Sequence, residues 1–187
     1  MALVISDALK QTNDPFSITY ESFPCLTIGQ SLARLCRYAG RGDFFLSVAQ
    51  HSALLSRVVP DEYRFAALMH DISEAFIGDI PGPFKRKFPE LEQAEEQIQE
   101  HIFGLFDIPF WHLDAIHEYD VRIRYDEMLA LGLATGDTDQ KLGVYVRRVT
   151  EQEAADAWVT EFLSCHARAQ RRKRATRRDA ILDQITL

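Results

Sequence analysis

Residues 70–85 read HDISEAFIGDIPGPFK and carry the strongest indication of fold and chemistry in the chain. The stretch opens on His70 and Asp71, and Glu74 follows the histidine at i+4, on the same side of a helix. Two prolines and two glycines then shape a loop that should hold Asp79 at a fixed position. A His-Asp pair alone often arises by chance, so its meaning depends on where its partners fall.

Hydrophobic periodicity places those partners on helices. Residues 43–58 predict a helix with His51 inside its apolar stripe, and residues 61–77 predict a second helix that carries His70. Residues 110–132 predict a third helix, whose apolar stripe contains two carboxylates, Asp120 and Glu127.

Each of these polar residues has an ordinary explanation when it is taken singly. A histidine on an apolar face is often a hydrogen-bonded core residue, and Asp120 could pair with Arg124 at i+4. Buried charge is costly, however, unless it is paired or bound to a metal. Histidines and carboxylates on the inward faces of three helices therefore favour a site for one divalent transition metal.

The remaining sequence is also mostly helical by pattern. Further helices are predicted over residues 27–39, 89–106 and 151–172. The segments FSITY (16–20) and GVYVRRV (143–149) are candidates for one short β-hairpin. A length of 187 residues fits one domain. We therefore expect an all-α, single-domain bundle with at most one hairpin.

Composition restricts the compartment and the partners. No run of about 18 apolar residues is present, so no membrane span is expected. The first residues, MALVISDALKQTNDP, lack a basic start and a long apolar stretch, so they do not predict a secretory signal. The three cysteines, Cys25, Cys36 and Cys165, are widely spaced and are expected to be reduced thiols. A cytoplasmic protein is the resulting prediction.

Charge is unevenly distributed along the chain. Residues 168–187 carry +5 and the whole chain carries −7, so residues 1–167 carry −12. An acidic body disfavours nucleic acid as the main substrate. The basic segment RAQRRKRATRR (168–178) has three interpretations: a solvated helix end, a contact with the acidic face of another subunit, or a nucleic-acid contact.

Four stretches resemble the HD-domain phosphohydrolase superfamily: LARLCRYAG (32–40), SVAQHS (47–52), HDISEAFIGDIPGPFK (70–85) and YDVRIRYDE (119–127). Within it, they are most similar to the small bacterial and phage 5′-deoxynucleotidase branch, whose close relatives include phage deoxynucleoside triphosphate triphosphohydrolases. The resemblance implies an HD-domain helical bundle at 27–167, between an N-terminal extended segment (1–26) and a basic C-terminal tail (168–187).

The resemblance also implies roles for individual residues. The metal ligands would be His51, His70, Asp71 and Asp120, and they would hold Mn, Co, Zn or Fe. Glu74 would orient or deprotonate the attacking water. On the substrate side, Asp79 would meet the sugar hydroxyl, Arg37 would hold phosphate, and Tyr38 would pack on the sugar or base, where relatives often carry Trp or Phe. Lys85 follows the loop and could add a second positive charge for phosphate.

Three functions remain open at this point. The first is a 5′-deoxynucleotidase, which converts a deoxynucleoside monophosphate to the nucleoside and phosphate. The second is a deoxynucleoside triphosphate triphosphohydrolase, with Lys85, Arg86 and Lys87 facing the outer phosphates. The third is a non-catalytic regulatory module that keeps the metal. By analogy with relatives, the chain is expected to be a homo-oligomer that acts on a small nucleotide.

Some binuclear members of the superfamily place two further histidines between the ligands that correspond to Asp71 and Asp120. Here His101, His112 and His117 lie in that interval. Because the 70–85 block resembles the mononuclear branch, one metal is the prediction.

Overall fold

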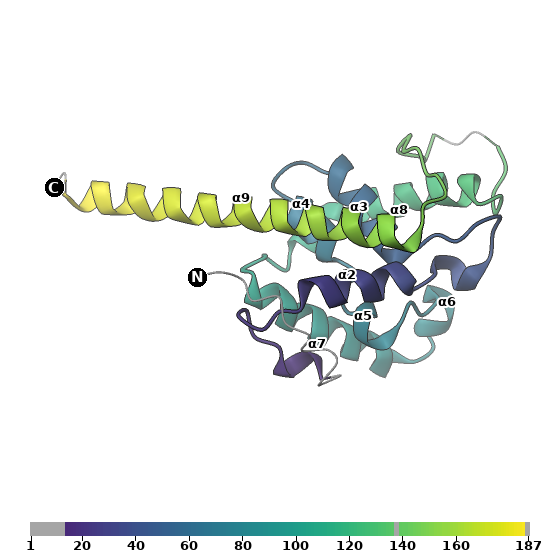
Figure 1. Cartoon of the computed structure of the whole chain (residues 1–187), viewed down its shortest axis with the longest axis horizontal. Coiled ribbons are helices and arrows are strands. Elements are labelled where there is room, and N and C mark those ends of the chain that lie inside the picture. Colours follow the sequence, from purple (N-terminus) through teal and green to yellow (C-terminus); the bar gives the residue numbers. More distant parts are fainter. Residues whose placement is uncertain (1–13, 137–138, 186–187) are drawn as a thin grey trace.

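The computed structural model describes residues 14–136 and 139–185, with side chains through residue 178. The described chain is helical and contains no strand, which confirms the predicted all-α class (Figure 1). Its elements are η1 (Pro15–Ser17), α2 (Cys25–Arg34), η2 (Arg37–Gly40), α3 (Val48–Val58), α4 (Arg64–Met69), α5 (Glu74–Ile77), α6 (Gly82–Lys85), α7 (Pro89–Leu105), α8 (His112–Ala130) and α9 (Glu151–Ile185).

The first half of α9 organises the core, because it packs against α2, α3 and α4. Trp158 and Phe162 of α9 are fully buried, and the Trp158 indole N–H donates to the Leu68 carbonyl oxygen of α4 at 3.3 Å. Gly29 of α2 lets the two backbones approach closely, since a Cβ there would lie 2.8 Å from Val159. Apolar residues from both ends of the sequence thus form one core beneath α4, the helix that leads to His70.

The predicted helix over residues 61–77 is interrupted. α4 ends at Met69 and α5 begins at Glu74, and between them the N–H groups of Ile72 and Glu74 donate to carbonyls three residues back, at 3.0 and 3.1 Å. Such i→i+3 bonds tighten the turn to about three residues. The apolar face of the predicted helix is still buried across this break, since Leu68, Met69 and Ile72 all lie in the core.

Helix boundaries differ from the prediction where local capping overrides periodicity. α3 begins at Val48 rather than at residue 43, because the Ser47 side chain caps it by accepting from the Gln50 N–H at 3.1 Å. The predicted helix 27–39 is divided into α2 and the short η2. α7 and α8 lie within two residues of their predicted bounds.

The predicted β-hairpin is wrong. Residues 15–17 form the 3-10 helix η1, which Asp14 caps by accepting from the Phe16 N–H at 3.0 Å, and residues 143–149 have no regular secondary structure. Within residues 14–136 and 139–185, the bridge between Cys36 and Ser47 is the strand-like pairing that occurs. Proline at the first position of η1 favours the helical turn over a strand.

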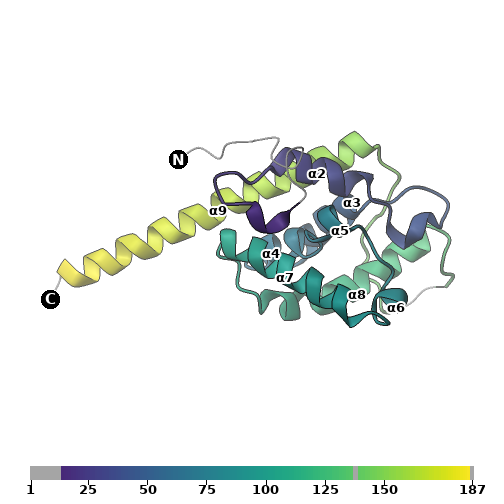
Figure 2. The same cartoon turned by 90° about the horizontal axis from the view of Figure 1, so that it is seen from below.

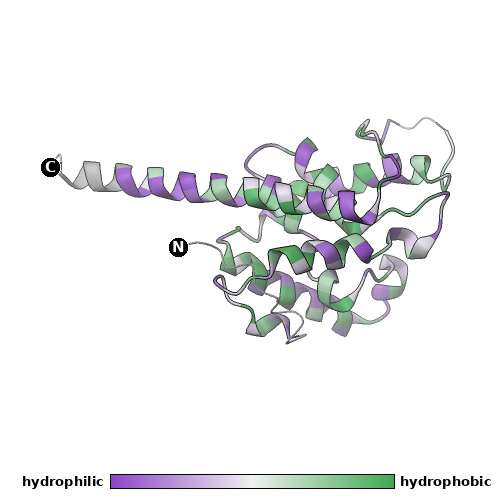
Figure 3. Ribbon diagram, in the orientation of Figure 1, coloured by the Kyte–Doolittle hydropathy of each residue, from purple (hydrophilic) through white to green (hydrophobic). Residues whose placement is uncertain are grey.

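α9 continues beyond its predicted end at residue 172, and its second half projects away from the body (Figures 1 and 2). Residues 171–178 are all exposed, and this part of the helix is hydrophilic (Figure 3). The basic tail is therefore helical and free of the core. No helix in the described residues combines the length and the apolar character needed to span a bilayer.

Candidate active site

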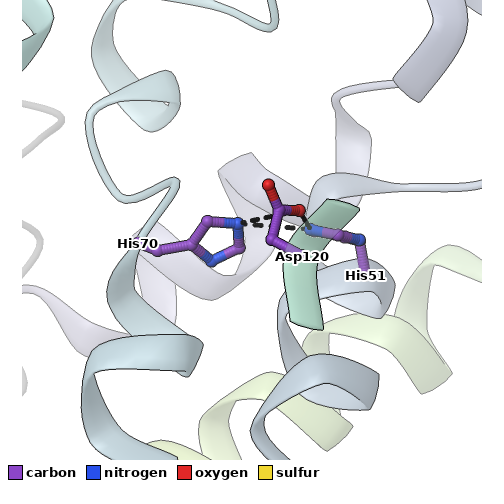
Figure 4. A group of neighbouring side chains, drawn as sticks. All are labelled: His51, His70 and Asp120. Atoms are coloured by element: carbon purple, nitrogen blue, oxygen red, sulfur yellow. Dashed lines mark hydrogen bonds and ion pairs between the residues drawn. The ribbon is translucent and has the colours of Figure 1, made fainter. Parts of the chain in front are cut away.

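Three of the predicted ligands meet in the centre of the bundle, where His51 of α3, His70 after α4 and Asp120 of α8 point toward one another (Figure 4). The two histidine Nε2 atoms are 3.2 Å apart, and Asp120 Oδ1 lies 3.2 Å from His51 Nε2 and 3.8 Å from His70 Nε2. The other Asp120 oxygen pairs with Arg124. Asp120 therefore forms the predicted ion pair with Arg124 and also takes part in the cluster.

Asp71, the fourth predicted ligand, faces the same point. Its Oδ2 atom lies 3.1 Å from His70 Nε2 and 3.7 Å from His51 Nε2. In a regular α-helix the side chains of adjacent residues diverge by about 100°. The tight turns between α4 and α5 allow His70 and Asp71 to approach one centre, so the break in the predicted helix serves the site.

The donor set fits a transition metal. The Nδ1 atom of His70 lies 2.8 Å from the Ala67 carbonyl oxygen, and that of His51 lies 2.6 Å from a Glu127 oxygen. Both partners only accept, so each Nδ1 carries a proton and each Nε2 is left to hold a second proton or to bind a metal. Two lone pairs at 3.2 Å repel unless a proton or a cation lies between them. Ligand bonds of about 2.1 Å separate neighbouring donors by roughly 3.0–3.6 Å, close to the spacing seen here.

Electrostatics keep the cluster carboxylates ionised. Burial alone would raise the pKa of Asp71, but the adjacent His70, then His51 and Arg37, lower it well below its usual range. Asp120 is also held below its ordinary pKa, because its hydrogen bond to His51 and the charge of His70 outweigh burial. Ionised carboxylates are the form that binds a divalent cation.

Glu127 is a functional residue whose role the sequence did not reveal. It is fully buried and accepts from His51 through Oε1, while Oε2 accepts from the Tyr38 hydroxyl at 2.7 Å and from Arg37 Nε at 3.2 Å. Burial would raise the pKa of Glu127, but Arg37 and His51 lower it to about 2. Its place in the α8 stripe, seven residues after Asp120, was the available signal.

Arg37 and Tyr38 reach the site from η2. Arg37 Nη1 donates to Asp71 Oδ2 at 3.3 Å, so the guanidinium joins the cluster to Glu127. Its hydrogen bonds to the described residues use Nε and Nη1, which leaves Nη2 available for an anion. Tyr38 and Ala39 have φ values of 58° and 53°, a left-handed conformation that costs non-glycine residues roughly 1–2 kcal/mol. Backbone strain of this kind concentrates at functional sites.

A cavity of about 490 Å³ opens beside the cluster. This size is typical of small-molecule sites. Its lining is Arg37, Tyr38, Asp71, Glu74, Asp79, Ile80, Pro81, Gly82, Pro83, Lys85, Arg86, Asp120 and Arg124. The substrate-side residues predicted for a monophosphate are all present, whereas Lys87, predicted to face the outer phosphates of a triphosphate, is not in the lining. His51 and His70 are absent from the lining, so the carboxylates of the cluster form its floor.

Glu74 is the most unusual side chain in this lining. It is 5% exposed, and its Oε2 atom has no hydrogen-bond partner among the described residues. Burial first, and then the charges of Asp71 and Asp79, raise its pKa well above the ordinary value. A carboxylate with a raised pKa is a stronger base, and a buried carboxylate oxygen without a protein partner is unusual enough to indicate a functional role.

The loop after α5 presents Asp79 and two cations to the cavity. Gly78 has φ 83°, which ends α5 while its N–H donates to the Glu74 carbonyl at 2.8 Å. Asp79 has a raised pKa, mainly because of burial. Lys85 forms an ion pair with Glu95 of α7, so a phosphate would share this ammonium with a carboxylate. Arg86 and Arg124 also line the cavity. The sequence predicts no contact between either of them and the phosphate of a monophosphate substrate.

The extra histidines do not join the cluster. His101 bonds the Ile18 carbonyl oxygen at 3.0 Å, His112 packs edge-on against Tyr63 and Trp111, and His117 is exposed. Among the described residues, the group that could hold a metal is His51, His70 and Asp120. This arrangement agrees with the one-metal prediction.

Adjacent His and Asp residues that face a histidine and an aspartate from two other helices are the arrangement typical of HD-domain phosphohydrolases. The comparisons specify the branch. Residues 44–105 match the family model described as 5′-deoxynucleotidase YfbR-like. The resemblance inferred from the motifs is thereby confirmed.

Two relatives extend the comparison. The chain is 40% identical over 109 residues to the uncharacterized protein YfdR of Escherichia coli, a match that covers 58% of this chain and 61% of YfdR. It is 32% identical over 91 residues to an uncharacterized protein of Rhodobacter capsulatus, covering 42% of this chain and 46% of the relative. The match thus spans less than two thirds of either relative. Both are uncharacterized, so the similarity to this family indicates a phosphohydrolase and leaves its substrate to be proposed.

Proposed function

We propose that the protein is a metal-dependent 5′-deoxynucleotidase, which hydrolyses a deoxynucleoside 5′-monophosphate to the deoxynucleoside and phosphate. The observation that carries this proposal is the buried Glu74, which lines the same cavity as Asp71 and Asp120 and has one oxygen without a hydrogen-bond partner among the described residues. A metal kept only for folding needs no such base beside it. The catalytic interpretation is therefore favoured over a silent regulatory module.

The chain's own residues divide the work. In this proposal His51, His70, Asp71 and Asp120 hold one divalent cation, which when bound supplies Lewis-acid activation of water and of a phosphoryl oxygen. Glu74 orients the attacking water and takes its proton. Arg37 offers its free Nη2 to phosphate, Tyr38 packs against the nucleoside, and Asp79 accepts a hydrogen bond from the sugar hydroxyl. Lys85 contributes a second positive charge.

The charge balance of the cavity favours a monophosphate. Four carboxylates line it, Asp71, Glu74, Asp79 and Asp120, against four cations, Arg37, Lys85, Arg86 and Arg124. A divalent cation and a phosphate monoester of charge near −2 would add to zero and keep this balance. A triphosphate carries more negative charge than one metal can offset. The deoxynucleoside triphosphate triphosphohydrolase is thus the second candidate.

A substrate screen tests the proposal. We expect deoxynucleoside monophosphates to release orthophosphate in the presence of Mn²⁺ or Co²⁺, with triphosphates turned over weakly or not at all. All deoxynucleoside mono- and triphosphates would be assayed against a panel of divalent ions, with orthophosphate and tripolyphosphate quantified separately. Tripolyphosphate as the main product would select the second candidate, and no hydrolysis of either class would remove both.

We further propose that residues 27–167 form the catalytic domain and that the basic tail (168–187) mediates homo-oligomerisation in the cytoplasm. Isolated helices of about a dozen residues are marginal in water, so the projecting end of α9 needs a partner. Glu92, Glu96 and Glu100 form an exposed row at i+4 spacing on α7, where like charges destabilise the helix. A second copy could pair its row of Arg171, Arg174 and Arg178 with these three glutamates. Three free cysteines fit a reducing compartment.

Charge reversal tests this assembly. The triple change Arg171→Glu, Arg174→Glu and Arg178→Glu should weaken self-association, measured by sedimentation velocity at low and high salt. Adding Glu92→Lys, Glu96→Lys and Glu100→Lys in the same chain should restore it, because both rows then exchange sign. Self-association that survives the first triple change, or a wild-type protein that is monomeric at low salt, would show that these rows do not pair.

A further inference from the structure

Glu127 connects the metal-ligand cluster to η2, the segment that carries Arg37 and Tyr38. Its Oε1 atom faces the metal-ligand cluster, 2.6 Å from His51 Nδ1, while its Oε2 atom faces η2, where Tyr38 and Arg37 donate to it. No solvent reaches this carboxylate. Each of its oxygens is therefore committed to a different half of the site.

The contact to His51 determines which ring nitrogen is available for a metal. A carboxylate accepts and cannot donate, so it fixes the His51 proton on Nδ1 and leaves Nε2 free toward His70 and Asp120. His70 is oriented in the same way, but by the neutral Ala67 carbonyl oxygen. A charged acceptor makes the imidazole a stronger ligand than a neutral one does.

The contact to η2 determines where Arg37 stands. This side chain is 10% exposed, and a buried guanidinium is costly without carboxylate partners. Glu127 and Asp71 hold its Nε and Nη1, and the Tyr38 hydroxyl on the same Glu127 oxygen stabilises the left-handed turn that carries both residues. Phosphate-side geometry thus depends on the same carboxylate as metal-ligand geometry.

We propose that Glu127 is a positioning residue that sets the tautomer of His51 and the placement of Arg37 together, and so couples metal affinity to substrate affinity. The inference rests on the proposed metal centre and substrate role of Arg37. It assigns no contact between Glu127 and the substrate or the metal. Loss of this carboxylate should therefore lower both the metal affinity and the substrate affinity.

Glu127→Gln is the informative change, because it keeps the shape but replaces one acceptor oxygen by a donor nitrogen. If the nitrogen faces His51, Nδ1 must accept, and the ring proton moves to Nε2, where it blocks the metal. If the nitrogen faces η2, it opposes the N–H of Arg37 at the present 3.2 Å, and His51 keeps only a neutral acceptor. Metal affinity falls in both orientations.

The experiment measures Co²⁺ binding to the full chain without nucleotide, by its visible absorption and by competition with a chelator. We expect Glu127→Gln to bind Co²⁺ roughly 10–100-fold more weakly, the usual effect of losing an outer partner of a ligand. With saturating metal, KM for the substrate should also rise. The matched control is Asp126→Asn, since this neighbouring buried carboxylate accepts instead from the Leu142 and Gly143 N–H groups at 2.8 and 3.1 Å. That variant should keep wild-type Co²⁺ affinity.

A second measurement does not depend on whether a variant folds. Nitrogen-15 spectra of histidine in the Zn²⁺-loaded wild-type protein should show the His51 ring with its proton on Nδ1 in a short hydrogen bond. A folded Glu127→Gln protein with wild-type Co²⁺ affinity, or a wild-type His51 with its proton on Nε2, would overturn the inference. Failure of the wild-type chain to bind Co²⁺ at all would instead remove the metal centre itself, so the two failures are distinguishable.

Discussion

Asp71→Ala is expected to abolish both hydrolysis and metal retention. The change removes the oxygen that lies 3.1 Å from His70 Nε2 and 3.7 Å from His51 Nε2, and it also removes a partner of the buried Arg37. Metal affinity should fall by more than the roughly 10–100-fold that the loss of an outer hydrogen-bond partner costs. Elemental analysis after gel filtration and orthophosphate release measure the two effects.

The control for Asp71→Ala is Asp61→Ala. Asp61 is 68% exposed and pairs with Arg64 and Arg168 at the surface, where such pairs contribute little. This variant should keep its metal and its activity. An Asp71→Ala protein that retained stoichiometric metal would exclude Asp71 from the ligand set and would leave the three-residue group of His51, His70 and Asp120.

Glu74→Ala should separate chemistry from metal binding. Glu74 lines the cavity but is not part of the ligand group, so the variant should bind Co²⁺ as the wild-type protein does. Turnover should fall by roughly 10²–10⁴, the usual contribution of general acid–base catalysis. Steady-state kinetics at saturating metal would locate the loss in kcat, with KM little changed.

Glu74→Gln provides the matched control, because it preserves size and polarity but cannot take a proton. It should be nearly as slow as Glu74→Ala if proton transfer is the role of this residue. A glutamine variant that recovers most of the turnover would indicate that Glu74 only orients the water. Full activity in Glu74→Ala would show that another group acts as the base.

The sequence predicted most of the helices and the proximity of His51, His70 and Asp120, because inward-facing positions leave a periodic signal. A histidine and an aspartate inside apolar stripes were sufficient to bring His51 and Asp120 together in the prediction. The break between α4 and α5 left no such signal, since Leu68, Met69 and Ile72 keep helical spacing through it. Short-range i→i+3 bonds at His70–Ser73 depend on how the turn packs beneath α9, which periodicity does not encode.

The role of Glu127 escaped prediction for a related reason. Spacing placed it inside the bundle, but its partners come from α3 and η2, 76 and 89 residues away for His51 and Tyr38. Which nitrogen of His51 faces the metal is a matter of rotamer and tautomer, neither of which appears in a sequence. The hairpin prediction was wrong because it was based on the β-propensity of FSITY (16–20) and ignored the preceding Pro15 and the Asp14 cap.

The order of synthesis gives α9 a particular importance. Every predicted metal ligand is translated before Glu151, yet α2, α3 and α4 all bury their apolar faces against α9. A nascent chain that ends before α9 would expose those faces to water and to other chains. Productive folding is therefore expected late in translation, after α9 in the last fifth of the polypeptide has emerged.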